Sequence, residues 1–190
     1  MLPPLSAVYA AVARARLAAY RRGWLSVAKL AAPVISVGNL TTGGTGKTPL
    51  VEWVCRVLAG ESVPGIVVAE PPKKVCVLTR GYGRANPKSQ VVVSNGTEIL
   101  VDERDSGDEP MLLARNLLGT AAVIANPNRV AAGEWALKNL GSEAFVLDDG
   151  FQHLRLARDL DIVTIDATNP FGGSRLLPAG RLREPISGLA

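Results

Sequence analysis

A glycine-rich turn at the end of an apolar segment constrains this chain more than any other feature. Residues 34–50 read VISVGNLTTGGTGKTPL, so an apolar run leads into glycines and then into Gly46-Lys47-Thr48. A strand, a turn whose backbone N–H groups surround an anion, and a helix N-terminus in this order form a phosphate-binding loop. In such a loop Lys47 reaches the β- and γ-phosphates and the Thr48 hydroxyl binds Mg²⁺. The segment therefore predicts a nucleotide site.

The loop departs from the usual spacing at one position, where threonine 41 stands in place of glycine. The alternative to phosphate binding is a glycine-rich turn with a chance Lys-Thr pair. The order of strand, glycines, Lys-Thr and helix favours phosphate binding. We expect the nucleotide to be bound by Thr41, Thr42, Gly43, Gly44, Thr45, Gly46, Lys47 and Thr48.

The composition is that of a globular protein. The chain has 190 residues, of which 47% are apolar and 20% charged, which suits one domain with a real core and argues against disorder. No apolar run approaches the roughly 18 residues needed to span a bilayer. Cys55 and Cys76 lie in a predicted helix and a predicted strand without zinc-type spacing, and we expect both to be buried in a reducing compartment.

The N-terminal segment is basic and amphipathic. No acid precedes Glu52, and the spacing of apolar residues predicts a helix over residues 5–24. Its apolar stripe consists of Leu5, Val8, Tyr9, Val12, Leu17, Tyr20 and Trp24, and its cations are Arg14, Arg16, Arg21 and Arg22. Such a helix can lie on an anionic membrane or simply pack on the domain. A transit peptide is disfavoured, because the segment runs directly into the first predicted strand. We expect residues 1–28 to form this helical segment and residues 29–190 the domain.

Strands alternate with helices along the rest of the chain. Strands are predicted at 34–38, 75–79, 121–125, 144–148 and 161–165, with helices at 49–58, 108–118 and 128–140. Residues 60–74 are predicted as a loop, and residues 90–101 as a β-hairpin turning at Asn95-Gly96. This alternation predicts an α/β fold of the P-loop NTPase type, with a mostly parallel sheet between helices. Ligands of such sheets bind at the carboxyl ends of the strands.

A second polar group follows the strand at 144–148. This strand ends in Asp148-Asp149, a pattern by which nucleotide-binding folds hold Mg²⁺ beside the phosphate loop. The alternative is that the two acids merely cap the next turn. Gln152 and His153 follow on the same loop, and His153 is the chain's single histidine.

The segment Ser106-Gly107-Asp108-Glu109 starts a predicted helix. Acids there stabilise the helix N-terminus, and a carboxylate there could also serve as a general base. Spacing leaves these alternatives open. Five arginines are either solvated charges or phosphate ligands: Arg80, Arg84, Arg129, Arg181 and Arg183.

Taken together, these segments resemble the tetraacyldisaccharide 4′-kinases, the lipid A 4′-kinases of Gram-negative bacteria. The matching stretches are VISVGNLTTGGTGKTP, LTRGYGR, SGDEPMLLA, VLDDGFQHLRLARDLDIV and RLLPAGRLREP, from about Val34 to Pro185. The resemblance implies ATP- and Mg²⁺-dependent phosphorylation of the 4′-hydroxyl of a tetraacylated glucosamine disaccharide 1-phosphate. It places the protein at the cytoplasmic face of the inner membrane. Threonine at position 41 is usual in this family.

The resemblance also implies residue roles. Lys47 holds the phosphates, Thr48, Asp148, Asp149, Gln152 and Glu184 lie on the metal side, and Asp108 is the base. For the substrate we expect contacts from Arg80, Tyr82, His153 and Arg183. The pI of about 9.3 would favour a nucleic-acid ATPase. It is disfavoured because only 5% of residues are aromatic and several of these lie in the N-terminal stripe. We expect no nucleic-acid partner.

Family members are much longer than this chain. They continue after the LREP segment into a second domain, whose His-rich stretch is thought to assist the aspartate base. With the sequence ending at Ala190, we expect a fragment of a larger protein or a shortened paralogue. The alternative function is therefore a nucleotide-binding lobe with impaired catalysis, since closure and water exclusion normally precede phosphoryl transfer.

Overall fold

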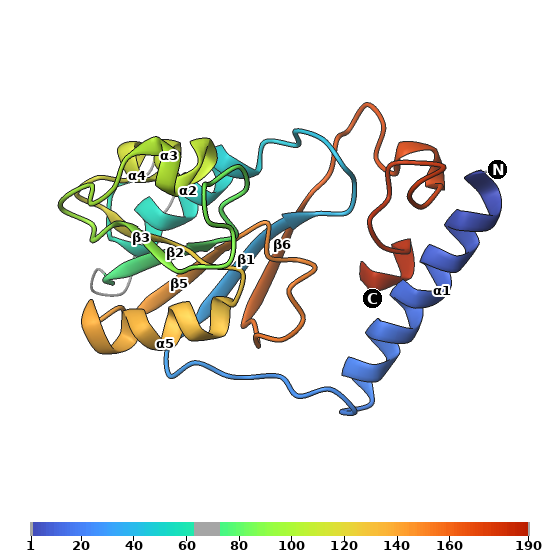
Figure 1. The fold of residues 1–190 in the computed structure, drawn as a ribbon, viewed down its shortest axis with the longest axis horizontal. Coiled ribbons are helices and arrows are strands. Elements are labelled where there is room, and N and C mark those ends of the chain that lie inside the picture. Colours follow the sequence, from blue (N-terminus) through green and yellow to red (C-terminus); the bar gives the residue numbers. More distant parts are fainter. Residues whose placement is uncertain (1, 63–72, 190) are drawn as a thin grey trace.

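The fold is built on a six-stranded sheet in the order β3-β4-β2-β5-β1-β6 (Figure 1). The computed structural model describes residues 2–62 and 73–189. The parallel strands are β1 (Val34–Asn39), β2 (Val75–Thr79), β4 (Ala121–Ala125), β5 (Ala144–Asp148) and β6 (Leu160–Thr164). Strand β3 (Val91–Ser94) runs antiparallel to β4 at one edge. Strands β2, β4 and β5 are buried along their whole length, as expected for continuous apolar segments within a parallel sheet.

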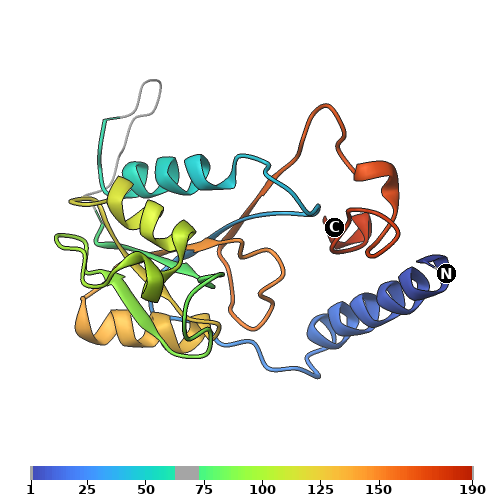
Figure 2. The ribbon, with the colours of Figure 1, turned by 45° about the horizontal axis from the view of Figure 1, so that its top comes forward.

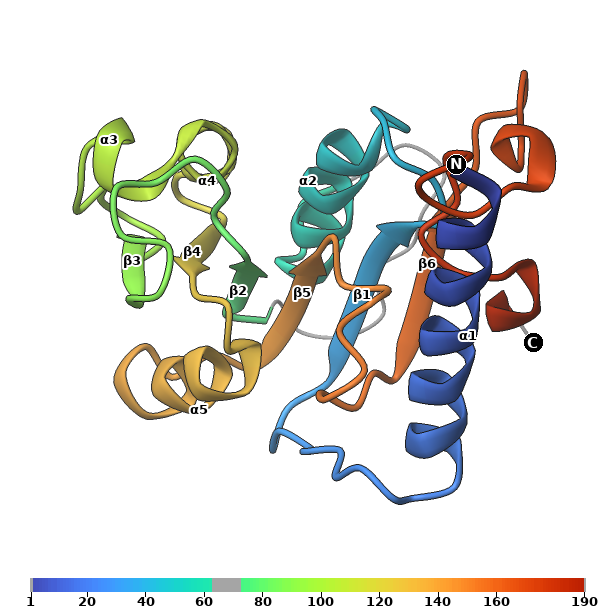
Figure 3. The same ribbon diagram turned by 45° about the vertical axis from the view of Figure 1, so that its right-hand side comes forward.

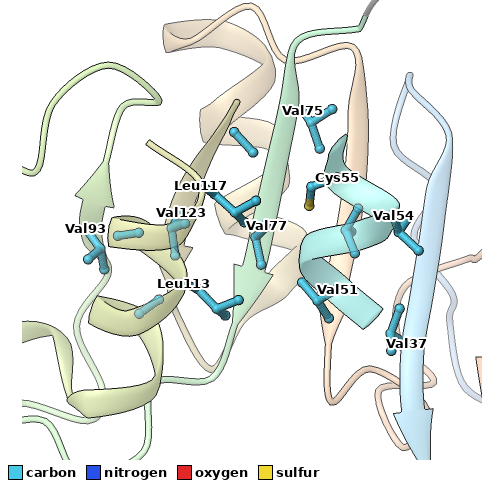
Figure 4. Close-up of a cluster of buried hydrophobic side chains, with 14 of the residues drawn as sticks. Val37, Val51, Val54, Cys55, Val75, Val77, Val93, Leu113, Leu117 and Val123 are labelled. Atoms are coloured by element: carbon cyan, nitrogen blue, oxygen red, sulfur yellow. The ribbon is translucent and has the colours of Figure 1, made fainter. Parts of the chain in front are cut away.

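Helices cover both faces of the sheet (Figures 1 and 2). One face carries α2 (Lys47–Leu58), α3 (Glu103–Ser106) and α4 (Asp108–Asn116), and the other carries α5 (Arg129–Asn139). The first layer packs around Val37, Val51, Val77, Leu113 and Val123 (Figure 4). The second layer brings residues of α5 against the opposite side of β2 and β5. The predicted α/β architecture with a mostly parallel sheet is confirmed.

The parallel strands all end at one edge of the sheet, as Figure 3 shows for β1, β2 and β5. Strand β1 lies between β5 and β6, with Val37 in register with Asp148. The loop after β1 therefore starts beside the acids that end β5. Arg80 follows β2 at the same edge. This convergence positions the candidate site.

Helix α1 (Leu2–Arg21) stands outside these layers, beside the C-terminal segment (Figures 1 and 3). Leu5, Val8 and Val12 are 57%, 63% and 63% exposed, so much of the predicted apolar stripe faces outward. The helix contacts the domain through a neighbouring face that includes Ser6 and Tyr9. It thus packs on the domain and also presents apolar surface. Within residues 2–62 and 73–189, no helix combines the length and apolar character needed to cross a membrane.

Three local predictions need adjustment or lie outside the described residues. The chain does turn back after β3, with a bridge from Ser94 to Ile99, but the return arm is this isolated bridge rather than a strand, and the partner of β3 is β4. A short helix, α3, precedes α4, because Asp102 accepts a hydrogen bond from the Asp105 amide and caps it. Of the predicted loop at 60–74, residues 63–72 lie outside the described part.

Two short 3₁₀ helices, η1 (Gly172–Ser174) and η2 (Ile186–Leu189), complete the C-terminal segment. Cys55 and Cys76 are free and buried, as predicted. Burial raises the pKa of both thiols, so neither is ionised near neutral pH.

Candidate functional site

The glycine-rich loop links β1 to α2 and leaves its glycines open. Asn39 ends β1, and its Nδ2 donates to the Gly43 carbonyl at 3.4 Å and to Thr45 Oγ1 at 3.0 Å. Gly46 adopts φ 74°, a left-handed conformation that glycine reaches without strain, and the helix begins at Lys47. Gly43, Gly44 and Gly46 are exposed. The first amides of α2 therefore face an open space suited to an anion.

The first part of the predicted loop has protein partners of its own. Thr41 forms an antiparallel bridge with Leu182, and the Thr42 amide donates to the Arg181 carbonyl at 2.8 Å. The Thr45 hydroxyl is paired with Thr164 Oγ1 at 2.8 Å. These contacts fix the loop from its β1 side. The open backbone groups lie from Gly43 onward.

Asp148 is buried at the end of β5, with 1% of its surface exposed. Thr79 donates to Asp148 Oδ2 at 2.9 Å, while Oδ1 is buried without a hydrogen-bond partner. Burial, followed by the negative charge of Glu109, raises the pKa of Asp148 to about 6. Sequence spacing placed Glu109 only at the start of a helix. Its effect on the pKa of Asp148 could be recognised only from the fold.

Asp149 sits in a left-handed backbone conformation, with φ 50°. Its Oδ1 lies 3.7 Å from Lys47 Nζ, and its Oδ2 accepts a 2.7 Å hydrogen bond from Arg183 Nη1. Asp149 Oδ1, like Asp148 Oδ1, is buried and has no hydrogen-bond partner among residues 2–62 and 73–189. Two such carboxylate oxygens, one of them 3.7 Å from the phosphate-loop lysine, are the kind of ligand that Mg²⁺ takes. The residues present therefore fit a magnesium ion.

Asp108 is the first residue of α4 and is exposed. The residue that precedes the helix is Gly107, which provides no side-chain cap, and within the described residues the Asp108 carboxylate forms no hydrogen bond. Gly107 packs directly against the Tyr82 carbonyl, where a Cβ atom would collide. The loop after β2 and the start of α4 are thereby held together, and the Asp108 carboxylate is left open to solvent.

The five arginines separate into different environments. Arg84 is buried and donates to the carbonyls of Ala125 and Pro87, so it braces its own loop. Arg80 is exposed, donates to the Tyr82 hydroxyl at 3.0 Å and lies over that ring. Arg181 is exposed. Arg84 therefore has a structural role, and the phosphate-ligand alternative stays open for Arg80, Arg129, Arg181 and Arg183.

Arg129 begins α5 and is only 5% exposed. Within the part of the chain that the structure describes, its guanidinium has one hydrogen bond, at 3.4 Å to the Pro127 carbonyl, and Nε has no hydrogen-bond partner. Burial lowers the pKa of Arg129 to about 10, so the side chain remains charged at neutral pH. A buried cation with so few partners is suited to an anionic ligand.

A pocket of ≈630 Å³ lies between α1 and the end of β5. Asp149 belongs to its wall, whereas residues of the glycine-rich loop do not, so the pocket extends from the site toward α1. The side chains that line it are Tyr9, Val12, Ala13, Arg16, Leu17, Arg80, Tyr82, Pro127, Arg129, Asp149, Gln152, His153, Leu154, Leu177, Arg183 and Glu184. Polar and charged groups thus converge with apolar residues of the helix.

The remaining predicted residues occupy different parts of this pocket. Gln152 donates to the Asn39 carbonyl at 2.9 Å and faces Arg183. Burial, reinforced by Arg129 and other arginines, lowers the pKa of His153 to about 4, so this imidazole is neutral at pH 7. Burial raises the pKa of Glu184. The charged residues that also act on this carboxylate are Arg16, Arg158 and Asp161, and neither Asp148 nor Asp149 is among them. Among the described residues, no three His, Cys, Asp or Glu side chains form a metal-binding group.

A glycine-rich loop leading into a helix, with its lysine beside a strand-end acid pair on a parallel sheet, defines a P-loop nucleotide-binding protein of the kinase type. The family model described as tetraacyldisaccharide-1-P 4′-kinase (LpxK) matches residues 1–190. The chain belongs to this family.

Relatives that carry this name agree with the assignment. The tetraacyldisaccharide 4′-kinase of Anaeromyxobacter dehalogenans strain 2CP-C is 47% identical over 183 residues, covering 96% of this chain and 45% of the relative. That of Geobacter sulfurreducens is 46% identical, covering 95% and 48%. A crystal structure of LpxK from Aquifex aeolicus in complex with ATP superposes with a TM-score of 0.86 at 40% identity. It is covered over 54% of its length, so the chain spans about half the length of the relatives it matches.

Proposed function

We propose that this chain forms the nucleotide- and acceptor-binding part of a lipid A 4′-kinase. The reaction is ATP-dependent phosphorylation of the 4′-hydroxyl of a tetraacylated glucosamine disaccharide 1-phosphate. The observation that carries the proposal is the 3.7 Å approach of Lys47 to Asp149, which joins the phosphate loop to the acid pair in a chain matched by the family over all its residues. The domain would comprise residues 29–190, with residues 1–28 as its surface helix.

On the nucleotide side, the amides from Gly43 to Thr48 and the start of α2 bind the β- and γ-phosphates of ATP, and Lys47 adds a point charge. Asp148, Asp149 and Thr48 would hold Mg²⁺. When bound, the ion neutralises charge on the β- and γ-phosphate oxygens. Gln152 and Glu184 remain proposed metal-side groups. In the structure Gln152 hydrogen-bonds Asn39 and Arg183, and the positive charges that act on the Glu184 carboxylate are those of Arg16 and Arg158.

Asp108 is proposed as the general base. Its carboxylate is exposed and has no hydrogen-bond partner among the described residues, so it is free to accept the proton of the 4′-hydroxyl. The hydroxyl oxygen then forms a bond to the γ-phosphorus as the bond to the β–γ bridging oxygen breaks, and ADP leaves. Lys47 and the nearby arginines stabilise the charge that moves to that bridging oxygen.

The acceptor is proposed to occupy the pocket beside Asp149. Asp149 is already paired with Lys47 and Arg183, whereas Arg129 is buried and forms no ion pair with the described carboxylates, although the charges of Asp148 and Asp149 act on it. The pocket therefore has surplus positive charge, which favours a phosphate-bearing acceptor. Arg80, Tyr82 and His153 line the same pocket, and His153, being neutral, can hydrogen-bond a sugar hydroxyl.

Helix α1 is proposed to rest on the cytoplasmic face of the inner membrane. Its exposed Leu5, Val8 and Val12 offer apolar surface, and its arginines favour anionic lipid headgroups. This placement brings the pocket, whose wall includes Val12, to the surface at which a lipid acceptor would be presented.

A second candidate function is nucleotide binding without efficient transfer. It is favoured by one observation, that this chain covers only 45% to 54% of the relatives quoted above. If closure of the site requires the part of the relatives that the chain does not cover, ATP would bind but transfer would be slow.

One experiment separates these candidates. The purified chain is incubated with γ-labelled ATP, Mg²⁺ and the disaccharide 1-phosphate, alongside Lys47→Ala and the surface control Lys138→Ala. The kinase proposal expects 4′-phosphorylated product, a loss of about a hundredfold or more in Lys47→Ala, and no loss in Lys138→Ala. ATP binding without product supports the second candidate, and equal product from Lys47→Ala refutes the kinase proposal.

A further inference from the structure

Three hydrogen bonds fasten α1 to the segment that carries Arg183. The Ser6 hydroxyl donates to the Leu176 carbonyl at 3.1 Å and accepts from the Ala179 amide at 3.0 Å. The Tyr9 hydroxyl donates to the Arg183 carbonyl at 2.8 Å. These bonds join residues more than 160 positions apart in sequence, in agreement with the side-by-side arrangement seen in Figures 1 and 3.

The other side of this segment is bonded to the beginning of the phosphate loop. The Arg183 amide donates to the Leu40 carbonyl at 2.7 Å, and the Arg181 carbonyl accepts from the Thr42 amide at 2.8 Å. Leu182, between them, is 1% exposed and packs with Leu40. Residues 181–183 therefore lie between α1 and the loop and are bonded to both.

Arg183 joins three parts of the molecule. Its carbonyl accepts from Tyr9, its amide donates to Leu40, and its guanidinium donates to Asp149. A change in the position of its backbone would therefore move both a cation beside the acid pair and the backbone that is bonded to the start of the phosphate loop.

Few α1 side chains are buried, and several of its polar side chains hydrogen-bond the domain. Among the α1 side chains that the structure describes, Ala10 alone is buried, while Leu5 and Val8 face outward and the exposed Val12 lines the open pocket beside Asp149. Hydrogen bonds from Ser6, Tyr9 and Arg16, whose guanidinium donates to the Gln152 carbonyl at 3.1 Å, therefore help to fix where the helix sits.

We propose that Tyr9, supported by Ser6, is a positioning residue for the phosphate site, acting through the backbone of Arg183. This inference rests on the proposed function, because it assigns to a residue of the surface helix an effect on MgATP binding. Tyr9 itself needs no contact with the nucleotide. Its hydroxyl holds the segment that supports Leu40, Thr42 and the Arg183–Asp149 pair.

The test uses Tyr9→Phe, which removes the hydroxyl but keeps the ring that lines the pocket. Tyr20→Phe is the matched control, because Tyr20 lies on the same helix and its hydroxyl forms no hydrogen bond with the described residues. Calorimetric titration of the 190-residue chain with MgATP, well below the unfolding midpoint of every variant, gives the affinity. We expect affinity to fall about three- to tenfold in Tyr9→Phe, as for the loss of one hydrogen bond, and further when Ser6→Ala is added. Tyr20→Phe should match the unmodified chain.

Amide hydrogen exchange tests the positioning step without nucleotide. Tyr9→Phe should speed exchange of the Thr42 amide, which donates to the Arg181 carbonyl, and of the Arg183 amide, which donates to the Leu40 carbonyl. Exchange of the β2 amides should not change. An unchanged MgATP affinity together with unchanged exchange at these two amides would overturn the inference. A lower unfolding midpoint with unchanged affinity would also overturn it, since that is the signature of a merely structural contact.

The outcomes also separate this inference from the proposed function. Failure of the unmodified chain to bind MgATP would overturn the proposed function and, with it, the role of Tyr9 in nucleotide binding. Normal MgATP binding by the unmodified chain and by Tyr9→Phe would leave the kinase proposal intact and remove Tyr9 from it.

Discussion

Arg183 donates a 2.7 Å hydrogen bond from Nη1 to Asp149 Oδ2, across 34 residues of sequence. Lys47 lies 3.7 Å from the other carboxylate oxygen, so Asp149 stands between two cations. One carboxylate thereby holds the cation of the phosphate loop and that of the LREP segment in a single arrangement before any phosphate is bound.

Asp149→Asn should separate metal binding from phosphate binding. The amide removes the negative charge that Mg²⁺ requires, so we expect MgATP affinity to fall by about tenfold or more. Affinity for metal-free ATP should not fall, because Lys47 and Arg183 lose their carboxylate partner and become available to phosphate. Calorimetry with and without Mg²⁺ measures both values.

The matched control for this variant is Asp105→Asn, an exposed acid on α3. It should bind both forms of ATP like the unmodified chain. Equal losses for MgATP and metal-free ATP in Asp149→Asn would contradict the metal assignment and indicate a general disturbance of the loop.

Sequence reasoning located the parts of the site that are encoded locally. Lys47 follows β1 at the end of the glycine-rich loop, and the Asp148-Asp149 pair stands at the end of β5. Parallel strands bring the residues that follow them to the same edge of the sheet. The fold and this half of the site were therefore predictable from apolar runs and the residues next to them.

The parts that escaped prediction depend on long-range packing. Glu109 was assigned to a helix start, and its effect on Asp148 requires the first turn of α4 to come near the end of β5. Periodicity found the apolar stripe of α1 but could not tell which face would dock. The Tyr9 hydroxyl donates to the backbone carbonyl of Arg183. Because every residue has such a carbonyl, the sequence does not indicate which one accepts the bond.

Thr79 should set the pH at which the site binds metal. Its hydrogen bond favours ionised Asp148, whose pKa is about 6 because of burial. Thr79→Val removes this bond and raises the pKa further, so MgATP binding should weaken at pH 6 to 7 and recover at higher pH. Thr79→Ser keeps the hydroxyl and should follow the unmodified profile. Superimposable profiles for the valine and serine variants, measured by titration across this range, would refute the role of the hydroxyl.

Asp148→Asn should stabilise the metal-free protein at pH 8. The pKa of Asp148 is about 6 in the folded chain against a reference value of 3.8, so the folded state binds the proton more tightly. The stability contributed by protonation is present below pH 3.8 and is lost as pH rises through about 6. Above that pH the buried charge costs on the order of 3 kcal/mol, a net value that already includes the attraction to Lys47.

The comparison of Asp148→Asn with the unmodified chain isolates this group. Urea unfolding at pH 8 and at pH 4.5 without Mg²⁺ gives the two free energies of unfolding. The advantage of the variant should be largest at pH 8 and shrink at pH 4.5. The lowered pKa of His153 acts on stability with the opposite sign, but it is common to both proteins and cancels in the difference. An advantage that grows toward low pH would contradict the raised pKa.

The outward stripe of α1 should decide membrane binding. Leu5 and Val8 are 57% and 63% exposed, and neither lines the pocket beside Asp149. Replacing both with glutamate removes apolar surface and adds charges that anionic lipids repel. Since burying one such side chain contributes about 1.5 kcal/mol or more, partition to vesicles should fall by at least about tenfold.

Co-sedimentation with vesicles of phosphatidylglycerol and phosphatidylethanolamine measures this loss. The control places the same change on Leu112 and Leu118, which are 50% and 47% exposed, Leu112 on α4 and Leu118 just beyond it. Because the stripe and the phosphate loop lie on different parts of the molecule, the α1 variant should retain MgATP affinity while losing vesicle binding. Equal partition of the α1 and control variants would mean that the helix serves only to hold residues 176–184 in place.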